Sequence, residues 1–336
     1  MKKGTKATLL LAVIMILTGG IMSVVCLILG ASWEALRYPY HNSRAEMNIE
    51  AEYQADPAED TAWNEVAVIE QDAIMNGEDY QSWDFSAETI ENLSMDVGAG
   101  TLRIEPGDHY QVEVWGFDER VNVKVRNRTL YVDCEAYDLF GWISSGASYE
   151  SACPTVVVTV PEDADLGKVD CKVGIGNLTA DWLRAKTVRI DVDAGSFSCS
   201  QLEATEKIEI DVDAGGAEIL YGSCQGKLTV DVDAGSAWLY DFLAADTVFD
   251  VDAGDLVFNG SIEGNWKADC DVGSMEIWLT RGETDYNYMI DNDMGSVQVG
   301  SKDFSGMSNT KNLLNDAEFT GTIDCDMGSV TVMFDR

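Results

Sequence analysis

A five-residue motif, Asp-Val-Asp-Ala-Gly, recurs along the chain and constrains its fold more than any other feature. Exact copies end at Gly195, Gly215, Gly235 and Gly254. Looser copies end at Gly100, Gly174, Gly273, Gly295 and Gly328. From Gly174 to Gly295 the successive glycines are 21, 20, 20, 19, 19 and 22 residues apart. A regular period of this length is typical of a protein built from stacked repeats.

The residues around each glycine alternate between apolar and polar, as in a strand with one buried face. Apolar side chains stand five and three positions before the glycine, as Ile210 and Val212 do before Gly215. The position directly before the glycine, Ala in the exact copies, is expected to face inward as well. Beyond the glycine the inward phase shifts by one, because the next apolar residue is four positions on, as with Ile219. This shift predicts a corner at the glycine that joins two strands.

A repeat of about 20 residues is too small to bury its own apolar face, so such units must stack. We predict an all-β fold, a parallel β-solenoid over residues 85–336, with an antiparallel sandwich as the alternative. The last interval, from Gly295 to Gly328, is 33 residues and predicts a loop insertion near residues 301–315. Nothing obvious caps the C-terminal residues 330–336, which predicts an exposed strand edge open to self-association.

The N-terminal residues 1–33 predict one transmembrane helix. Three lysines precede an uncharged run of 27 residues, from Ala7 to Trp33, which exceeds the roughly 20 that span a bilayer. This charge pattern places the N-terminus in the cytoplasm and the C-terminal domain outside the cell. A cleaved signal peptide is the alternative, although its apolar core is usually only about 7–15 residues. Residues 34–84 contain 13 acids and two arginines and are expected to form an acidic stalk.

The net charge restricts the partners. The chain has 59 acidic and 22 basic residues, a formal net charge of -37. Such a chain repels nucleic acid, whose binding proteins need clustered Lys and Arg. It suits cations, basic partners or neutral glycans.

No pattern indicates catalysis or an organic cofactor. His41 and His109 belong to no triad arrangement, and no nucleophile elbow or phosphate loop follows a strand and opens a helix. A carbohydrate-active β-helix enzyme would pair Ca²⁺-binding aspartates with a basic catalytic residue. Basic residues are sparse beside the repeated aspartates. We therefore expect the chain not to be an enzyme.

Two acidic columns are the candidate metal site. The aspartates four and two positions before each glycine become ladders on one outer face, where carboxylates about 5 Å apart repel by roughly 1 kcal/mol even in water. Bound Ca²⁺, which prefers several carboxylate oxygens, would relieve this repulsion, and a solvated acidic face is the alternative. The same alignment places Asp170 in the first column and Lys172 in the second. The candidate ligands are Asp191, Asp193, Asp211, Asp213, Asp231, Asp233, Asp250 and Asp252.

The repeat places several of the eight cysteines in the core. Cys171, Cys270 and Cys325 stand three positions before a glycine, and Cys199 stands four after one, which predicts buried free thiols. In sequence order, the coil containing Asn292 separates Cys270 from Cys325. Two coil spacings then put these cysteines about 10 Å apart, which is beyond the reach of a disulfide.

A second group of candidates falls in a loop insertion at residues 134–153, between strands expected at 129–133 and 155–160. Cys134 and Cys153 flank this loop and are a candidate disulfide. Exposed aromatic residues are frequent binding hot spots and stack on sugars or peptides, and a loop folded back over the solenoid end is the alternative. The aromatic candidates are Tyr137, Phe140 and Trp142.

The Asp-x-Asp-x-Gly repeats, the opening Ile90–Ile104 and the strand Val-Val-Val-Thr-Val-Pro at 156–161 resemble the putative-adhesin domain family over about residues 85–334. The resemblance implies a β-solenoid at the bacterial cell envelope, behind one membrane anchor, and supplies no catalytic residues. We therefore expect a membrane-anchored extracellular binding or adhesion module for a glycan or a surface protein. The alternative is a structural or sensory envelope-stress protein that acts through self-association or a membrane partner.

Overall fold

A computed structural model describes residues 80–115, 121–134, 154–306 and 310–335. Strands dominate this part of the chain, and its only helical element is a 3-10 turn, η4 (Glu283–Asp285). The prediction of an all-β fold is confirmed. The predicted anchor lies outside the described residues, and within them no helix is long and apolar enough to cross a membrane. Strand β1 (Tyr80–Asp84) covers the last five residues of the predicted stalk.

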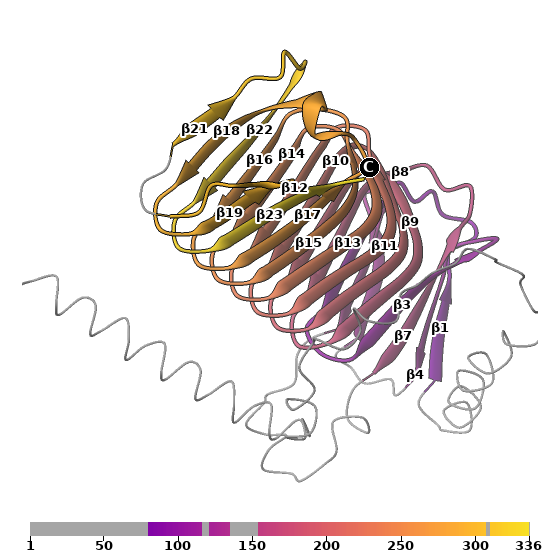
Figure 1. The fold of residues 1–336 in the computed structure, drawn as a ribbon. Coiled ribbons are helices and arrows are strands. Elements are labelled where there is room, and N and C mark those ends of the chain that lie inside the picture. The colour runs from indigo at the N-terminus through magenta and orange to yellow at the C-terminus, as the bar shows by residue number, and fades with distance from the viewer. Residues whose placement is uncertain (1–79, 116–120, 135–153, 307–309, 336) are drawn as a thin grey trace, which may run out of the picture. The chain divides into compact units, whose positions relative to one another are not determined.

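The strands stack in parallel coils (Figure 1). Each coil has one strand before its corner glycine and one after it, and these strands form a first and a second ladder of paired strands. The first ladder contains β2 (Asn92–Val97), β6 (Thr129–Cys134), β8 (Leu166–Val173), the second halves of β9 (Asn177–Val192) and β10 (Ser196–Val212), β12 (Lys227–Val232), β14 (Thr247–Val251), β16 (Trp266–Cys270), β18 (Tyr286–Asn292) and β22 (Phe319–Cys325). The second ladder contains β3 (Thr101–Gly107), β7 (Thr155–Pro161), the first halves of β9 and β10, β11 (Gly216–Cys224), β13 (Ser236–Ala244), β15 (Asp255–Ile262), β17 (Ser274–Leu279), β19 (Ser296–Val299) and β23 (Ser329–Phe334).

The coils stack in register, so equivalent residues of successive repeats lie beside one another. Ile210 pairs with Val230 and Val212 with Val232 on neighbouring strands β10 and β12. These four side chains are at most 1% exposed, as is Ile219 beyond the corner. Each coil therefore extends one continuous apolar core, and the predicted inward positions five before, three before and four after the glycine are confirmed for this repeat.

The corner requires glycine because the neighbouring coil leaves no room for a side chain. A Cβ on Gly195 would lie 2.2 Å from the carbonyl oxygen of Gly176 and 2.7 Å from Cγ1 of Val173. Real Cβ atoms do not approach other heavy atoms this closely, so any larger residue would push the two coils apart. The close coil-to-coil packing thus explains why glycine recurs at this position.

The coil around residue 174 is aligned differently from the prediction. Cys171 pairs with Ile190 and Val173 with Val192, so the counterpart of Gly195 is Gly176 and not Gly174. This two-residue shift moves Asp170 out of the first acidic column and puts Lys172 into it. The sequence allowed either alignment, because this repeat carries glycines at both positions.

The prediction that the residue before each corner glycine faces inward was wrong at most corners. The strand ends three residues before the glycine, and the two intervening positions belong to a turn that projects outward. Ala194, Ala234 and Ala253 are exposed. A small apolar residue such as alanine fits an exposed turn as well as a core, so its identity did not decide the orientation.

The spatial order of the coils departs from the sequence order at both ends. Strand β2 pairs with both β6 and β8. Strand β22 lies between β16 and β18, and β23 lies between β17 and β19. The last coil in the sequence is therefore inserted between the two coils that precede it. The expected sequential order and the expected exposed C-terminal edge are both wrong, since β23 is paired on both sides.

Antiparallel strands cover the ends of the stack. At one end, β4 (Gln111–Trp115) pairs with β7 and with β1, and β5 (Val121–Arg126) pairs with β6. At the other end, β20 (Lys302–Asp303) pairs with β19 and β21 (Lys311–Leu313) with β18. These last two strands lie in the loop insertion predicted near residues 301–315. Short, charged edge strands of this kind oppose the pairing of one copy with another.

Asn292 attaches this insertion to the last coil. Its side chain is fully buried, and its amide nitrogen donates to the carbonyl oxygens of Gly295, Phe304 and Gly306 at 3.2, 2.9 and 3.3 Å. A valine at this position would leave the carbonyls of the insertion without these donors. The asparagine in an otherwise apolar column is therefore structural.

Candidate functional site

The two predicted acidic columns lie in register along the outer face of the first ladder. The first column runs in register through Asp133, Asp96, Lys172, Asp191, Asp211, Asp231, Asp250, Asp269, Asp324 and Asp291. All of these residues except Asp133 stand four positions before a corner glycine. The second column stacks through backbone hydrogen bonds across the turns and runs through Asp193, Asp213, Asp233, Asp252, Asp271, Asp326 and Asp293. All eight candidate metal ligands stand in these columns, with neighbouring strands about 4.7–4.9 Å apart.

Basic side chains neutralise the flanks of the first column but not its middle. Lys172 Nζ lies 3.9 Å from Asp191 and 3.5 Å from Asp193, and Lys267 Nζ lies 2.5 Å from Asp269. Among the ion pairs of the described residues, none involves Asp231. Partial burial and the neighbouring carboxylates, Asp250 foremost, raise the pKa of Asp231 to about 6. The middle of the column therefore holds unrelieved negative charge at pH 7.

The described residues do not gather into a formed metal site. Within ranges 80–115, 121–134, 154–306 and 310–335, no three His, Cys, Asp or Glu side chains cluster closely enough to hold a metal ion. Each coil contributes one carboxylate to each column. A cation bound by several carboxylates would therefore be shared between neighbouring coils. The proposed Ca²⁺ ladder stays a prediction.

An exposed apolar row runs beside the second acidic column, at the position directly before each corner glycine. Val272, Met327 and Met294 form its largest part and are 57%, 57% and 61% exposed; we call these three residues the apolar corner. They lie on consecutive levels, because the Met327 amide donates to the Asp271 carbonyl and the Met294 amide to the Asp326 carbonyl, at 2.7 Å each.

Each residue of the apolar corner directly follows an aspartate of the second column, namely Asp271, Asp326 and Asp293. The surface therefore offers apolar contact and negative charge at each of three successive levels. Methionine side chains are flexible and polarisable, and they adapt to partners of different shape. Sequence reasoning missed this surface, although the replacement of alanine by valine and methionine in the last repeats was a usable signal.

A second apolar group lies on the outer side of β11 and β13. Leu220, Tyr221, Tyr240 and Leu243 are 40%, 57%, 37% and 50% exposed. These strands are neighbours in register, so the four side chains belong to one surface. It lacks the regular acidic columns that flank the apolar corner.

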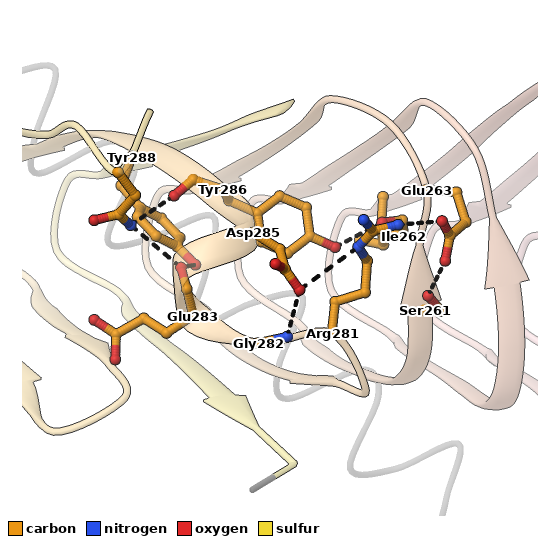
Figure 2. A network of polar contacts seen from close by, with 10 residues as sticks. Ser261, Ile262, Glu263, Arg281, Gly282, Glu283, Asp285, Tyr286 and Tyr288 are labelled. Carbon is orange, nitrogen blue, oxygen red and sulfur yellow. Dashed lines mark hydrogen bonds and ion pairs between the residues drawn. The ribbon is translucent and has the colours of Figure 1, made fainter. Parts of the chain in front are cut away.

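The polar network in Figure 2 is structural. Arg281 pairs with Glu263 and lies 4.0 Å from Asp285. The Tyr286 hydroxyl donates to the Ile262 carbonyl at 2.6 Å, and the Tyr288 hydroxyl donates to the Glu283 carbonyl at 3.0 Å. Both tyrosines are fully buried. The network thus fixes turn η4 and the start of β18, and its polar atoms are engaged in holding the coil.

Most of the remaining sequence candidates lie in a loop outside the described residues. Tyr137, Phe140, Trp142 and Cys153 lie outside the described residues, so the aromatic binding loop and the Cys134–Cys153 disulfide stay predictions. Cys134 itself is buried at the end of β6. The ring of His109 lies 2.6 Å from Asp108 in a bend, an exposed local pair.

Comparisons with known proteins agree with the repeat architecture. A family model described as Toastrack DUF4097 matches residues 90–332. A solved putative lipid binding protein from Parabacteroides distasonis shows a TM-score of 0.50 at 13% identity, covering 76% of this chain and 97% of that chain.

Putative adhesins from Bacteroides fragilis and Parabacteroides distasonis both have TM-scores of 0.47, at 13% and 15% identity. They cover 76% and 77% of this chain and 98% of their own. A search of curated proteins found no match. At these identities the structural likeness concerns the fold alone.

Proposed function

Because the chain belongs to the Toastrack DUF4097 family, we propose that it is a non-catalytic binding module of the bacterial cell envelope. The lysine-flanked apolar run at 7–33 anchors it as a single-pass protein with a cytoplasmic N-terminus and an extracellular β-domain. The observation that carries the binding role is the apolar corner, where three large apolar side chains on consecutive levels are more than half exposed. Contiguous exposed apolar surface on a folded domain is typical of an interaction site.

The chemistry of this surface favours a basic polypeptide that also carries apolar side chains. Two acidic columns run beside the apolar corner, and the chain has a net charge of -37, which attracts Lys and Arg and speeds association at low salt. A neutral glycan can hydrogen-bond to the carboxylates but carries no positive charge to pair with them, and an anionic surface would be repelled. An amphipathic basic segment satisfies the apolar and the acidic parts together.

Direct binding to the full chain in detergent micelles tests this proposal. Three probes are titrated: a fluorescent Lys/Leu amphipathic peptide, a Glu/Leu peptide of the same length, and an array of neutral glycans. We expect saturable binding of the Lys/Leu peptide only, weakening as NaCl rises because the attraction is screened. If glycans bind and the Lys/Leu peptide does not, the partner is a glycan and the proposal is wrong. Equal binding of the Lys/Leu and Glu/Leu peptides would refute the role of charge.

A further inference from the structure

The insertion of the last coil brings two cysteines together. Cys270 on β16 and Cys325 on β22 are partners in register, and both are fully buried. The neighbouring Cys325 thiol and burial together raise the pKa of Cys270. The expected separation of about 10 Å is wrong, because it placed the coil of Asn292 between them.

The backbone geometry suits a covalent link. Neighbouring parallel strands lie about 4.7–4.9 Å apart, which falls inside the roughly 4.4–6.8 Å that Cα atoms span across a disulfide. Both thiols are free in the structure, and the bond requires the two Cβ atoms to approach to about 3.5–4.5 Å. The two sulfur atoms also occupy equivalent places under successive corners. A Cβ on Gly328 would lie 2.4 Å from Cys270 Sγ, and one on Gly295 would lie 2.4 Å from Cys325 Sγ.

The other described cysteines have no such partner. Cys171 pairs with Met95 and Ile190, and Cys199 with Ala180 and Ile219. Cys224 pairs with Ala204 and Ala244, and Cys134 pairs with Val97 and Val121. Among the residues that the structure describes, Cys270 and Cys325 are therefore the one pair of cysteines placed side by side in the ladder.

We infer that Cys270 and Cys325 form a disulfide site that locks the last coil into its inserted position. Strands β22 and β23 end the chain, yet they must lie between coils formed earlier in the sequence. A bond from Cys325 to Cys270 ties this final coil to β16 and fixes the order of the last three coils. The inference depends on the coil order alone and stands apart from the proposed binding function.

The oxidant is an external disulfide, either a small molecule such as oxidised glutathione or a protein disulfide. The thiolate of one cysteine attacks the external disulfide, forms a mixed disulfide and releases one thiolate. The thiolate of the second cysteine then attacks the bonded cysteine sulfur and releases the second thiolate. The two cysteine protons end on the released thiols, and two electrons pass from the cysteines to the external disulfide. Since both sulfurs are buried in the folded chain, exchange takes place before β22 docks.

Peptide mapping of the oxidised full chain tests the inference. The protein is refolded with oxidised and reduced glutathione, denatured, alkylated without reduction, digested and analysed by mass spectrometry. We expect a linked peptide pair containing Cys270 and Cys325, with Cys199 alkylated. Alkylation of both Cys270 and Cys325, or glutathione bound to either one without a link, would overturn the inference.

A stability measurement adds an independent readout. A bond between Cys270 and Cys325 closes a long loop and so constrains the unfolded chain. Reduction of this bond should therefore lower the thermal midpoint of wild type by roughly 10 °C. In Cys325→Ala this decrease should be absent or much smaller, while the matched control Cys199→Ala should retain it. Because the mapping uses wild type, it decides the question even where Cys325→Ala fails to fold. An equal decrease in Cys325→Ala and in the control would assign the effect to another bond.

Discussion

The middle of the first acidic column predicts that removing one charge stabilises the fold. Asp231 lies between Asp211 and Asp250 in register, and its pKa is raised from 3.8 to about 6. A shift of about two pKa units corresponds to roughly 3 kcal/mol. Because the residue is only partly buried and is exposed to solvent, screening reduces this to about 1 kcal/mol. Asp231→Asn should therefore raise the free energy of unfolding by about 1 kcal/mol at pH 7.5 and low salt.

The pH dependence of the free energy of unfolding independently tests whether the charge on Asp231 destabilises the fold. A carboxyl whose pKa is higher in the folded state binds its proton more tightly there, so wild type recovers stability as pH falls through about 6 and recovers it fully by about 3.8. The advantage of Asp231→Asn should thus be large at pH 7.5 and small at pH 4. Urea unfolding of the full chain at both pH values measures it. Asp255→Asn is the matched control, because Asp255 pairs only with Ser236 and Ser274. An equal gain at both pH values, or a gain of the same size in the control, would refute the electrostatic explanation.

Three further predictions concern the core, the cations and the topology. Val212→Asp places an unpaired charge in the core and should destabilise by several kcal/mol, whereas Asp211→Asn should cost little; equal urea midpoints would show that the faces are wrongly assigned. CaCl₂ should raise the melting temperature more than NaCl at matched ionic strength if cations bind the columns, and replacing Asp211, Asp231 and Asp250 by Asn should abolish that difference; no Ca²⁺ increment in wild type would leave the face solvated. A reporter fused after Arg336 should be active only outside the cytoplasm, and activity of a cytoplasmic reporter would contradict the predicted topology.

Much of the fold was predictable because burial alternates within each repeat. The spacing of Ile210 and Val212 identifies the inward face of a strand. The change in the phase of alternation at Ile219 identifies the corner. The aspartate columns follow from the same spacing. The order of the coils was not predictable, because every coil offers a similar surface to its neighbours. Only the packing of the whole stack places β22 beside β16 and so brings Cys270 next to Cys325.

The candidate binding surface was predictable only in part. The acidic columns were identified from sequence, but the apolar corner was assigned to the core. Residue type alone does not distinguish an apolar residue in an exposed turn from one in a buried strand. The alternation pattern therefore assigned Met294 and Met327 to the core, although both are exposed. Their size was the available signal: a methionine where exact repeats have alanine requires space that an alanine position inside a tightly stacked core does not offer.

The proposed function requires that the apolar corner and the second acidic column beside it bind one basic amphipathic partner. Titration of the Lys/Leu peptide against the full chain, followed by fluorescence anisotropy, tests it most directly. Replacing Val272, Met294 and Met327 together by Asn should weaken binding at least about tenfold, since each side chain has more than half its surface left to bury. The matched control, Leu220→Asn with Leu243→Asn on the other apolar surface, should bind as wild type does. Unchanged affinity in the triple variant, with weakened binding in the control, would contradict this assignment and move the site to β11 and β13.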